Sequence, residues 1–277
     1  MSAQSKAKLA YAVWPWGLKT KEQLIQAVAD MKEVGFSNFE SVCLTVALFK
    51  DNVNEFKAIT EDNGVRAVSF YFYQRGDMAS DVRQVQEALD FLAACNVKRM
   101  SIQAAGKKGG ATEAELKGVL DYLDRIGKLC QPYGILPCLH PHASTMVMYE
   151  NEIDYVMQRV DPSLIWFGPD TAHLTVGKCD AVEIFKRYAN RIRFVHLKDV
   201  KKNKQVEGDD AKQGFEVYSD FLELGEGEVD IPGCLKVLES VGYDGYLTIE
   251  LDGSRFGNKQ SAIMNRDYMK KAGYSSK

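Results

Sequence analysis

Short runs rich in β-forming residues recur along the chain, and no other property of the sequence narrows the choice of fold as far. Most successive runs start about 30 residues apart, and the last gap is about 54 residues. One β-strand with its crossover helix needs roughly 30 residues. The spacing therefore predicts a series of βα units, with strands expected over residues 9–14, 38–42, 66–73, 97–104, 135–140, 164–168, 191–197 and 245–251.

The segments between these runs carry the start and stop signals of helices. Residues 20–23 and 112–115 each place a threonine three positions before Gln or Glu, the spacing of a capping box. Gly35 and Gly134 follow helical patterns, as glycines at the C-terminal end of a helix do. Strands and helices are therefore expected to alternate.

Eight βα units form a (β/α)8 TIM barrel of about 250 residues, close to the 277 residues of the chain. A doubly wound open sheet is the alternative, but no GxGxxG follows the first expected strand. We see no domain boundary and expect residues 1–277 to form one barrel domain. The long polar loop at 199–230 would lie over the C-terminal mouth, either as a lid or as a decorative insertion.

The overall charge argues against nucleic acid or a membrane as partner. Thirty-five Lys and Arg against 38 Asp and Glu give a net charge of −3, whereas both partners call for a basic surface. No run approaches the roughly 18 apolar residues of a membrane span. Six cysteines lie scattered without a CxxC pair, which fits neither a disulfide framework nor a zinc knuckle. No secretory signal is evident, so we expect a cytoplasmic location.

The four histidines of the chain all fall at the ends of expected strands. His140, His142, His173 and His196 each lie at such an end or within five residues after it. Active sites of βα barrels are built from the carboxyl ends of strands and the loops that follow them. The placement of the histidines therefore predicts an active site at that end of the barrel.

Two carboxylates share this placement. Asp170 follows the sixth expected strand, and Glu250 ends the eighth within an apolar run, where an unpartnered acid would be costly to bury. With His140 and His196 they would offer one divalent cation two nitrogen and two oxygen ligands. Such a mixed set suits Mn²⁺, our first expectation, or Co²⁺, Fe²⁺ or Zn²⁺ better than Mg²⁺, which prefers oxygen alone.

These residues lie in segments that resemble the xylose-isomerase-like TIM barrels, a family of sugar isomerases, ketose epimerases and inosose dehydratases. The segments are LIWFGPDTAHL, RFVHLKDV and LGEGEVDIPGCLKVLESVGYDGYLTIELD. In that family one divalent metal is held by Glu, Asp, His and Glu from four successive strand ends. Asp170, His196 and Glu250 match the last three. His140 stands where most members carry the first Glu, and the inosose dehydratases carry a His-rich stretch at the same place.

The resemblance, with this departure, implies a metal-dependent lyase that acts on a keto-polyol or keto-sugar through an enediolate. An elimination needs one base and one acid with unequal tasks. We expect Glu250 to act as ligand and base, and His142 or His140 as acid. Lys198 would anchor a substrate oxygen, with Asp199 to orient it. The alternatives are a sugar isomerase or ketose 3-epimerase of the same family, and a sugar-binding barrel without catalysis.

Further residues at the strand ends are candidates for contact with a carbohydrate or polyol substrate. The resemblance implies that His173 binds a sugar hydroxyl or supports the ligands. Glu40 and Gln103 end expected strands, and Trp14 and Trp16 follow the first one, where they could stack on a sugar or pack in the barrel wall. The family also allows a homo-oligomer.

Overall fold

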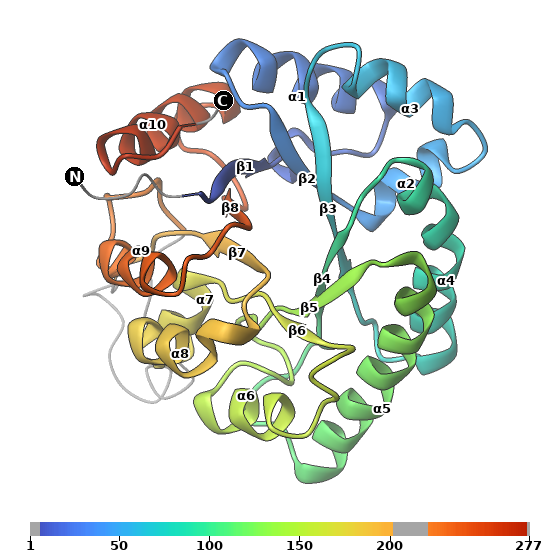
Figure 1. Cartoon of the computed structure of the whole chain (residues 1–277), viewed down its shortest axis with the longest axis vertical. Helices are drawn as coiled ribbons and strands as arrows, with labels where there is room; N and C mark the ends of the chain where they lie inside the picture. Colours follow the sequence, from blue (N-terminus) through green and yellow to red (C-terminus); the bar gives the residue numbers. More distant parts are fainter. Residues whose placement is uncertain (1–5, 202–220, 276–277) are drawn as a thin grey trace.

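Eight parallel strands form the barrel in the computed structural model, which describes residues 6–201 and 221–275. Their hydrogen-bonded order is β6-β5-β4-β3-β2-β1-β8-β7 (Figure 1). The strands are β1 (Lys8–Ala12), β2 (Asn38–Val42), β3 (Arg66–Tyr73), β4 (Arg99–Gln103), β5 (Leu136–Leu139), β6 (Trp166–Phe167), β7 (Phe194–Leu197) and β8 (Tyr246–Ile249). Isolated parallel bridges Phe167–Ile192 and Asp170–His196 join the segments of β6 and β7 and complete the ring.

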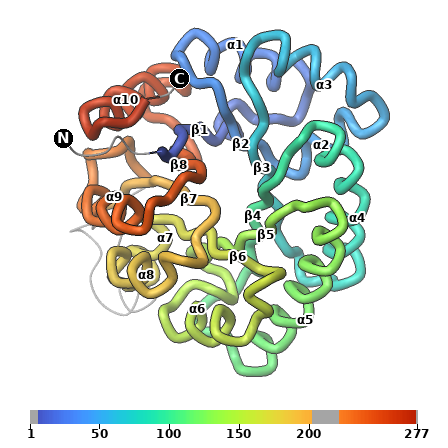
Figure 2. The backbone as a smooth tube through the Cα atoms, in the orientation of Figure 1, coloured from blue at the N-terminus to red at the C-terminus, as the bar shows by residue number. Residues whose placement is uncertain are grey.

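Helices surround the strands, as the tube in Figure 2 shows. They are α1 (Lys21–Val34), α2 (Cys43–Phe49), α3 (Val53–Thr60), α4 (Met78–Ala94), α5 (Glu113–Cys130), α6 (Glu150–Met157), α7 (Thr171–Val176), α8 (Ala181–Tyr188), α9 (Ile231–Ser240) and α10 (Asn258–Lys271), with 3-10 turns η1 (Trp14–Trp16), η2 (Gln131–Tyr133) and η3 (Ala189–Arg191). The expected (β/α)8 architecture is confirmed.

All eight expected strands are present, and their ends differ by a few residues. The largest difference is at β7, which begins at Phe194 rather than at residue 191 because the chain forms η3 there. Both capping boxes are confirmed: Thr20 Oγ1 and Thr112 Oγ1 accept the backbone N–H of Gln23 and Glu115. Gly35 ends α1 with φ near +100°, a left-handed conformation that favours glycine.

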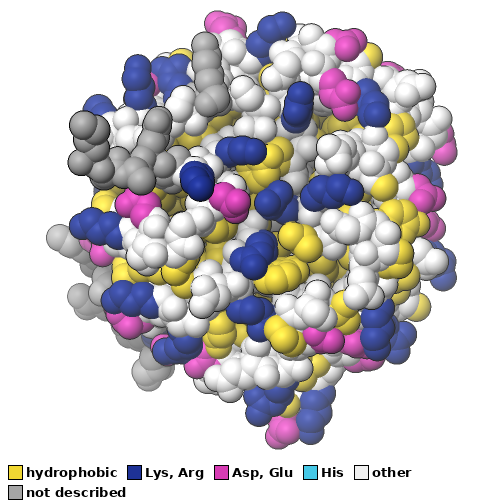
Figure 3. Space-filling model, in the orientation of Figure 1, with side chains coloured by type: hydrophobic (Ala, Val, Ile, Leu, Met, Phe, Trp, Pro, Cys, Tyr) yellow, Lys and Arg dark blue, Asp and Glu magenta, His cyan; other side chains and the backbone are white. Residues whose placement is uncertain are grey.

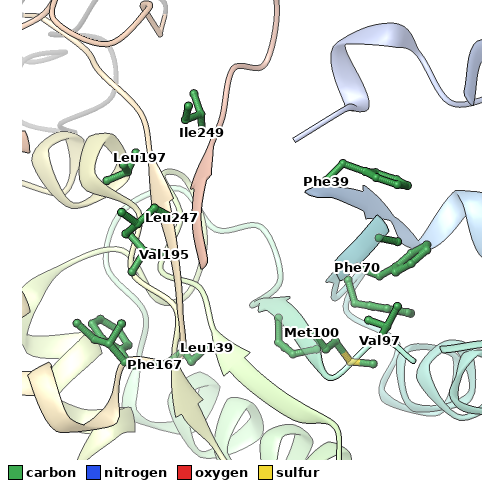
Figure 4. Packing of buried hydrophobic residues seen from close by; sticks show 14 of the residues in the cluster. Phe39, Phe70, Val97, Met100, Leu139, Phe167, Val195, Leu197, Leu247 and Ile249 are labelled. Atoms are coloured by element: carbon green, nitrogen blue, oxygen red, sulfur yellow. The ribbon is translucent and has the colours of Figure 1, made fainter. Parts of the chain in front are cut away.

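The apolar core lies between the strands and the surrounding helices. Successive residues of a strand point to opposite faces, so Phe70 and Phe72 of β3 point toward the helices while Tyr71 points into the barrel. Phe70 packs against Phe56 of α3 and Phe91 of α4. Figure 4 shows Phe39 and Phe70 together in this layer. The alternation leaves the inward positions of the strands free for polar side chains.

The inward side chains form layers along the barrel axis. Ala10, Val68, Cys138 and Phe194 form a small apolar cluster nearer the strand starts. Beyond Phe194, the next inward positions of β7 are His196 and then Lys198, just after the strand. The polar side chains are therefore gathered toward the carboxyl end of the barrel. Figure 3 shows one face of the molecule, on which Lys and Arg side chains lie near the middle and no histidine is visible.

The polar loop at 199–230 is described only at its two ends, because residues 202–220 lie outside the described chain. The expectation of a lid falls largely on those residues. Asp199 forms a bridge to Leu222, and its carboxylate accepts backbone N–H groups from Gly225, Gly227 and Val229 at 2.9–3.1 Å. Asp199 therefore holds the returning chain in place, and its carboxylate is committed to these N–H groups; an effect of Asp199 on Lys198 stays a prediction.

No helix within residues 6–201 and 221–275 combines the length and the apolar character needed to cross a bilayer.

Candidate active site

Four adjacent strands bring the expected metal ligands together. His140 follows β5, Asp170 follows β6, His196 lies in β7 and Glu250 follows β8. All four side chains are buried, and one nitrogen or oxygen from each lies within 4.8 Å of those of the other three. Residues more than 100 positions apart in sequence thus converge because parallel strands end at one edge of the barrel.

Three atoms of this cluster lack a partner. His140 Nε2, Asp170 Oδ2 and Glu250 Oε2 are buried and have no hydrogen bond from any residue in the described part of the chain. Buried polar atoms are rarely left unpaired, because desolvation without a partner costs free energy. A divalent cation would satisfy all three at once, and a mixed nitrogen and oxygen set fits a transition metal. The residues present therefore fit the implied metal.

The other oxygen of Asp170 is already engaged. Asp170 begins α7, and its Oδ1 accepts the backbone N–H of His173 at 2.7 Å. This bond fixes the carboxylate, so that Oδ2 is the atom left over for the cluster. Burial and the nearby Glu250 raise the pKa of Asp170 to about 7, against the opposing effect of Lys198 and His196.

The ring of His196 is held on both sides. Its Nε2 lies 2.5 Å from Glu40 Oε2, and its Nδ1 lies 2.9 Å from His140 Nδ1. Burial lowers the pKa of His196, but the carboxylates of Glu40, Glu250 and Asp170 outweigh that effect and raise it to about 9. The surrounding carboxylates therefore favour the protonated form of His196 at neutral pH.

Lys198 is a fully buried cation next to the cluster. Its Nζ lies 2.6 Å from Glu250 Oε1 and 2.9 Å from Asp252 Oδ1, and it lies 3.9 Å from the centre of the Phe221 ring. Burial lowers the pKa of Lys198, but the carboxylates of Glu250, Asp252 and Asp170 raise it above its usual value. Lys198 is thus an ammonium group that balances the charge of Glu250.

His142 and His173 stack beside this group, with ring centres 3.7 Å apart. His173 is buried, and its Nδ1 accepts the backbone N–H of Ala143 at 3.3 Å. His142 is half-buried, and its Nδ1 lies 2.7 Å from the Ala143 carbonyl oxygen, to which it must donate. Burial, then Lys198, lower the pKa of His142.

The contacts of His142 and Glu250 affect which of the two side chains can act as acid and which as base. A neutral ring that donates from Nδ1 carries a lone pair on Nε2, so His142 is arranged to accept a proton first. Glu250, the expected base, already binds the Lys198 ammonium through Oε1. The geometry therefore favours His142 over Glu250 as the group that removes a proton from a substrate.

Aromatic side chains cover the cluster on the β1–β4 side. The Trp14 ring lies 5.5 Å from that of Tyr71 and 6.2 Å from that of His196, and Tyr71 lies 5.1 Å from His140. The Tyr71 hydroxyl donates to Gln103 Oε1. Trp14 therefore lies beside His196, and Gln103 is joined to Tyr71; contact of either residue with a substrate stays a prediction. Tyr71 was not among the expected site residues, although its place near the end of an expected strand was a usable signal.

Trp16 and Glu40 lie away from the positions expected for substrate contact. Trp16 Nε1 donates to Asp30 Oδ2 on α1 at 2.8 Å, so this ring packs in the barrel wall. Glu40 has no exposed surface, and its two oxygens are both occupied inside the barrel. Its strand-end position predicted contact with a substrate, but Glu40 lies inside the barrel, where it meets His196.

The sequence is similar to a known protein family and to several enzymes named inosose dehydratase. The family model described as xylose isomerase-like TIM barrel matches residues 28–272. Inosose dehydratase of Clostridium perfringens is 34% identical over 163 residues, which cover 57% of this chain and 55% of that protein, so the chain spans about half the length of the first relatives it matches. Inosose dehydratase of Yersinia enterocolitica is 26% identical over 275 residues, covering 90% of this chain and 91% of that protein.

Solved structures share the fold at low sequence identity. The IolI protein with a bound zinc atom aligns with a TM-score of 0.76 at 14% identity, covering 96% of this chain and 97% of that one. L-ribulose 3-epimerase aligns with a TM-score of 0.76 at 15% identity, covering 96% of this chain and 94% of that one. These likenesses show the barrel fold alone.

Proposed function

The chain belongs to the xylose isomerase-like TIM barrel family, and from that premise we propose that it is a divalent-metal-dependent lyase. Its reaction would be a dehydration of a keto-polyol or keto-sugar, in line with relatives named inosose dehydratase. The observation that carries the proposal is the buried cluster of His140, Asp170, His196 and Glu250 with its three unpaired atoms.

These four residues would hold the ion, with Mn²⁺ our first expectation among the transition metals. When bound, a divalent cation polarises a carbonyl oxygen and favours loss of a proton from the adjacent carbon. The acid and base work then belongs to side chains beside the cluster.

His142 is the proposed proton carrier. It is the one histidine of the four with exposed surface, and its Nε2 carries the lone pair while Nδ1 is held by the Ala143 carbonyl. It would take the proton next to the substrate carbonyl, which gives an enediolate and an imidazolium. That imidazolium can return the proton to the departing hydroxyl group, so that one water leaves and the charges balance.

Lys198 and the neighbouring side chains would bind and orient the substrate. The Lys198 ammonium is fixed by Glu250 and Asp252 and offers positive charge where a substrate oxygen becomes negative. His173 is stacked on His142 and would keep that ring in place. Trp14 and Gln103 form a wall suited to a polyol, with one stacking surface and one amide.

The alternative is a sugar isomerase or ketose 3-epimerase, which shares the enediolate but loses no water. We retain this alternative because L-ribulose 3-epimerase has the same barrel fold. The resemblance implies a glutamate at the position of His140 in most members of the family, whereas this chain pairs a histidine there with the carboxylate of Glu250. The unequal pair favours elimination. A sugar-binding barrel without turnover is the third reading.

Product analysis separates these functions. The full chain, loaded in turn with Mn²⁺, Co²⁺, Fe²⁺ and Zn²⁺, is incubated with keto-inositols and ketoses, and products are identified by mass spectrometry. Loss of one water from a substrate supports the lyase, and a product of unchanged mass supports the isomerase or epimerase. Binding of the ion with no change in any substrate would contradict both.

A further inference from the structure

Glu40 is a buried carboxylate that the proposed reaction leaves without a task. It lies on β2 with no exposed surface, and it reaches across the barrel to His196 on β7, 156 positions away in sequence. A buried charge is tolerated when hydrogen bonds and an opposite charge compensate for its lost hydration. We therefore expect Glu40 to have a specific function inside the barrel.

We propose that Glu40 is a positioning residue that sets the affinity of the site for its divalent cation. Glu40 would hold His196 with the hydrogen on Nε2, so that the lone pair on Nδ1 stays free on the side of the ring that faces His140. This inference rests on the metal site of the proposed function, and it adds a residue that would touch neither the ion nor the substrate.

The first step of the argument is how Glu40 itself is fixed. Its Oε1 accepts hydrogen bonds from Ser69 Oγ of β3 and Ser101 Oγ of β4, each at 2.7 Å. Both serines are buried. Two hydroxyl donors on one oxygen orient the carboxylate, and they leave Oε2 as the atom that meets His196.

The second step is the direction of the bond to His196. Glu40 already accepts two hydroxyl groups through Oε1, and its Oε2 is a further acceptor 2.5 Å from His196 Nε2, so the ring nitrogen is the donor of this bond. In a neutral imidazole the other nitrogen then carries the lone pair. His196 Nδ1 lies 2.9 Å from His140 Nδ1 and therefore faces one of the proposed ligands, while His196 Nε2, on the Glu40 side, lies 3.6 Å from Glu250 Oε2.

The third step is why this contact affects affinity. A carboxylate that accepts from a metal-binding histidine fixes the ring orientation and makes the ring a stronger donor to the ion, and removing such a partner typically weakens metal binding 10–100-fold. A role in substrate binding, which the strand-end position first indicated, is at odds with the bonding of Glu40, because both of its oxygens are already occupied by Ser69, Ser101 and His196.

The test is the affinity of the metal-free full chain for Zn²⁺ and Mn²⁺, measured by competition with a chelating dye. Glu40→Gln keeps the shape of the side chain, but its amide either donates toward Nε2, which reverses the ring's protonation, or accepts without the charge. We expect affinity to fall roughly 10–100-fold. Glu152→Gln is the matched control, because Glu152 is equally buried and, among the described residues, accepts hydrogen bonds from the backbone N–H groups of Ala111, Met148 and Tyr149.

A second readout does not depend on affinity. In the zinc-loaded protein, ¹⁵N NMR of the histidine rings should show His196 protonated at Nε2, with a downfield proton that shifts in Glu40→Gln and stays in Glu152→Gln. A ring protonated at Nδ1, or equal affinity of Glu40→Gln and the wild type, overturns the inference.

The outcomes separate this inference from the proposed function. If the wild type and Glu40→Gln bind the ion equally well, the proposed role of Glu40 is wrong, while the proposed lyase is unaffected. Weakened binding in Glu40→Gln without turnover of any keto-sugar supports the role of Glu40 and contradicts the lyase. Wild-type protein that binds neither ion contradicts both.

Discussion

Lys198→Met removes the one ammonium group that touches Glu250, and its cost can be worked from the burial of the two partners. Lys198 has no exposed side-chain surface, and the Glu250 side chain is 3% exposed with Nζ and Oε1 2.6 Å apart. Removing one partner of a buried ion pair costs about 3–5 kcal/mol, because the other charge stays buried. Asp252 is 54% exposed and would add less than about 1 kcal/mol.

We therefore expect the free energy of unfolding of the metal-free protein to fall by about 3–5 kcal/mol, from the 5–15 kcal/mol typical of a folded domain. The measurement is urea-induced unfolding followed by circular dichroism. With Zn²⁺ or Mn²⁺ in excess the loss should be smaller, because a cation at the cluster would neutralise Glu250.

Lys186→Met is the matched control. Lys186 pairs with Glu183 at 2.6 Å, but both side chains are more than half exposed, so the loss should stay below about 1 kcal/mol. A Lys198→Met protein that is destabilised no more than this control would refute the view that Lys198 balances a buried charge.

Two further predictions concern the proton carrier and the ligands. His142→Ala should bind the divalent ion with an affinity close to that of the wild type while turnover falls by about 10²–10⁴, the usual contribution of a general acid–base residue; full activity of this variant would remove His142 from the mechanism. Affinity for the ion should rise from about pH 7 to pH 9, because protons held by Asp170 (pKa about 7) and His196 (pKa about 9) must leave when the ion binds. Calorimetry in buffers of different ionisation enthalpy measures that release, and an affinity that is constant or falls with rising pH would contradict it.

The fold followed from the sequence because its signals are local and repeated. Capping threonines such as Thr20, glycines such as Gly35 and the spacing of the strands each mark one βα unit, and eight units leave few architectures. The proposed ligands followed as well, because Asp170, His196 and Glu250 occupy the ends of strands that parallel pairing brings to one edge.

The remaining contacts depend on which face a side chain takes and on partners far away in the chain. Glu40 was expected to contact a substrate and Tyr71 was given no role, but the alternation of β2 and β3 turns both side chains into the barrel, where they meet His196 and His140. Asp199 looked like a partner of Lys198, but three backbone N–H groups about 30 residues later compete for its carboxylate. Such pairings between distant segments leave no periodic pattern in the sequence.

The closure of the ring between β6 and β7 has a consequence for stability. These strands stand at the two ends of the hydrogen-bonded order, and isolated bridges rather than a continuous ladder join them. One of those bridges pairs Asp170 with His196, two of the proposed ligands. An ion bound to both residues would link the segments of β6 and β7. A ligand that binds only the folded state stabilises the folded protein in proportion to the logarithm of the ligand concentration. The integrity of the barrel wall would then vary with the supply of metal.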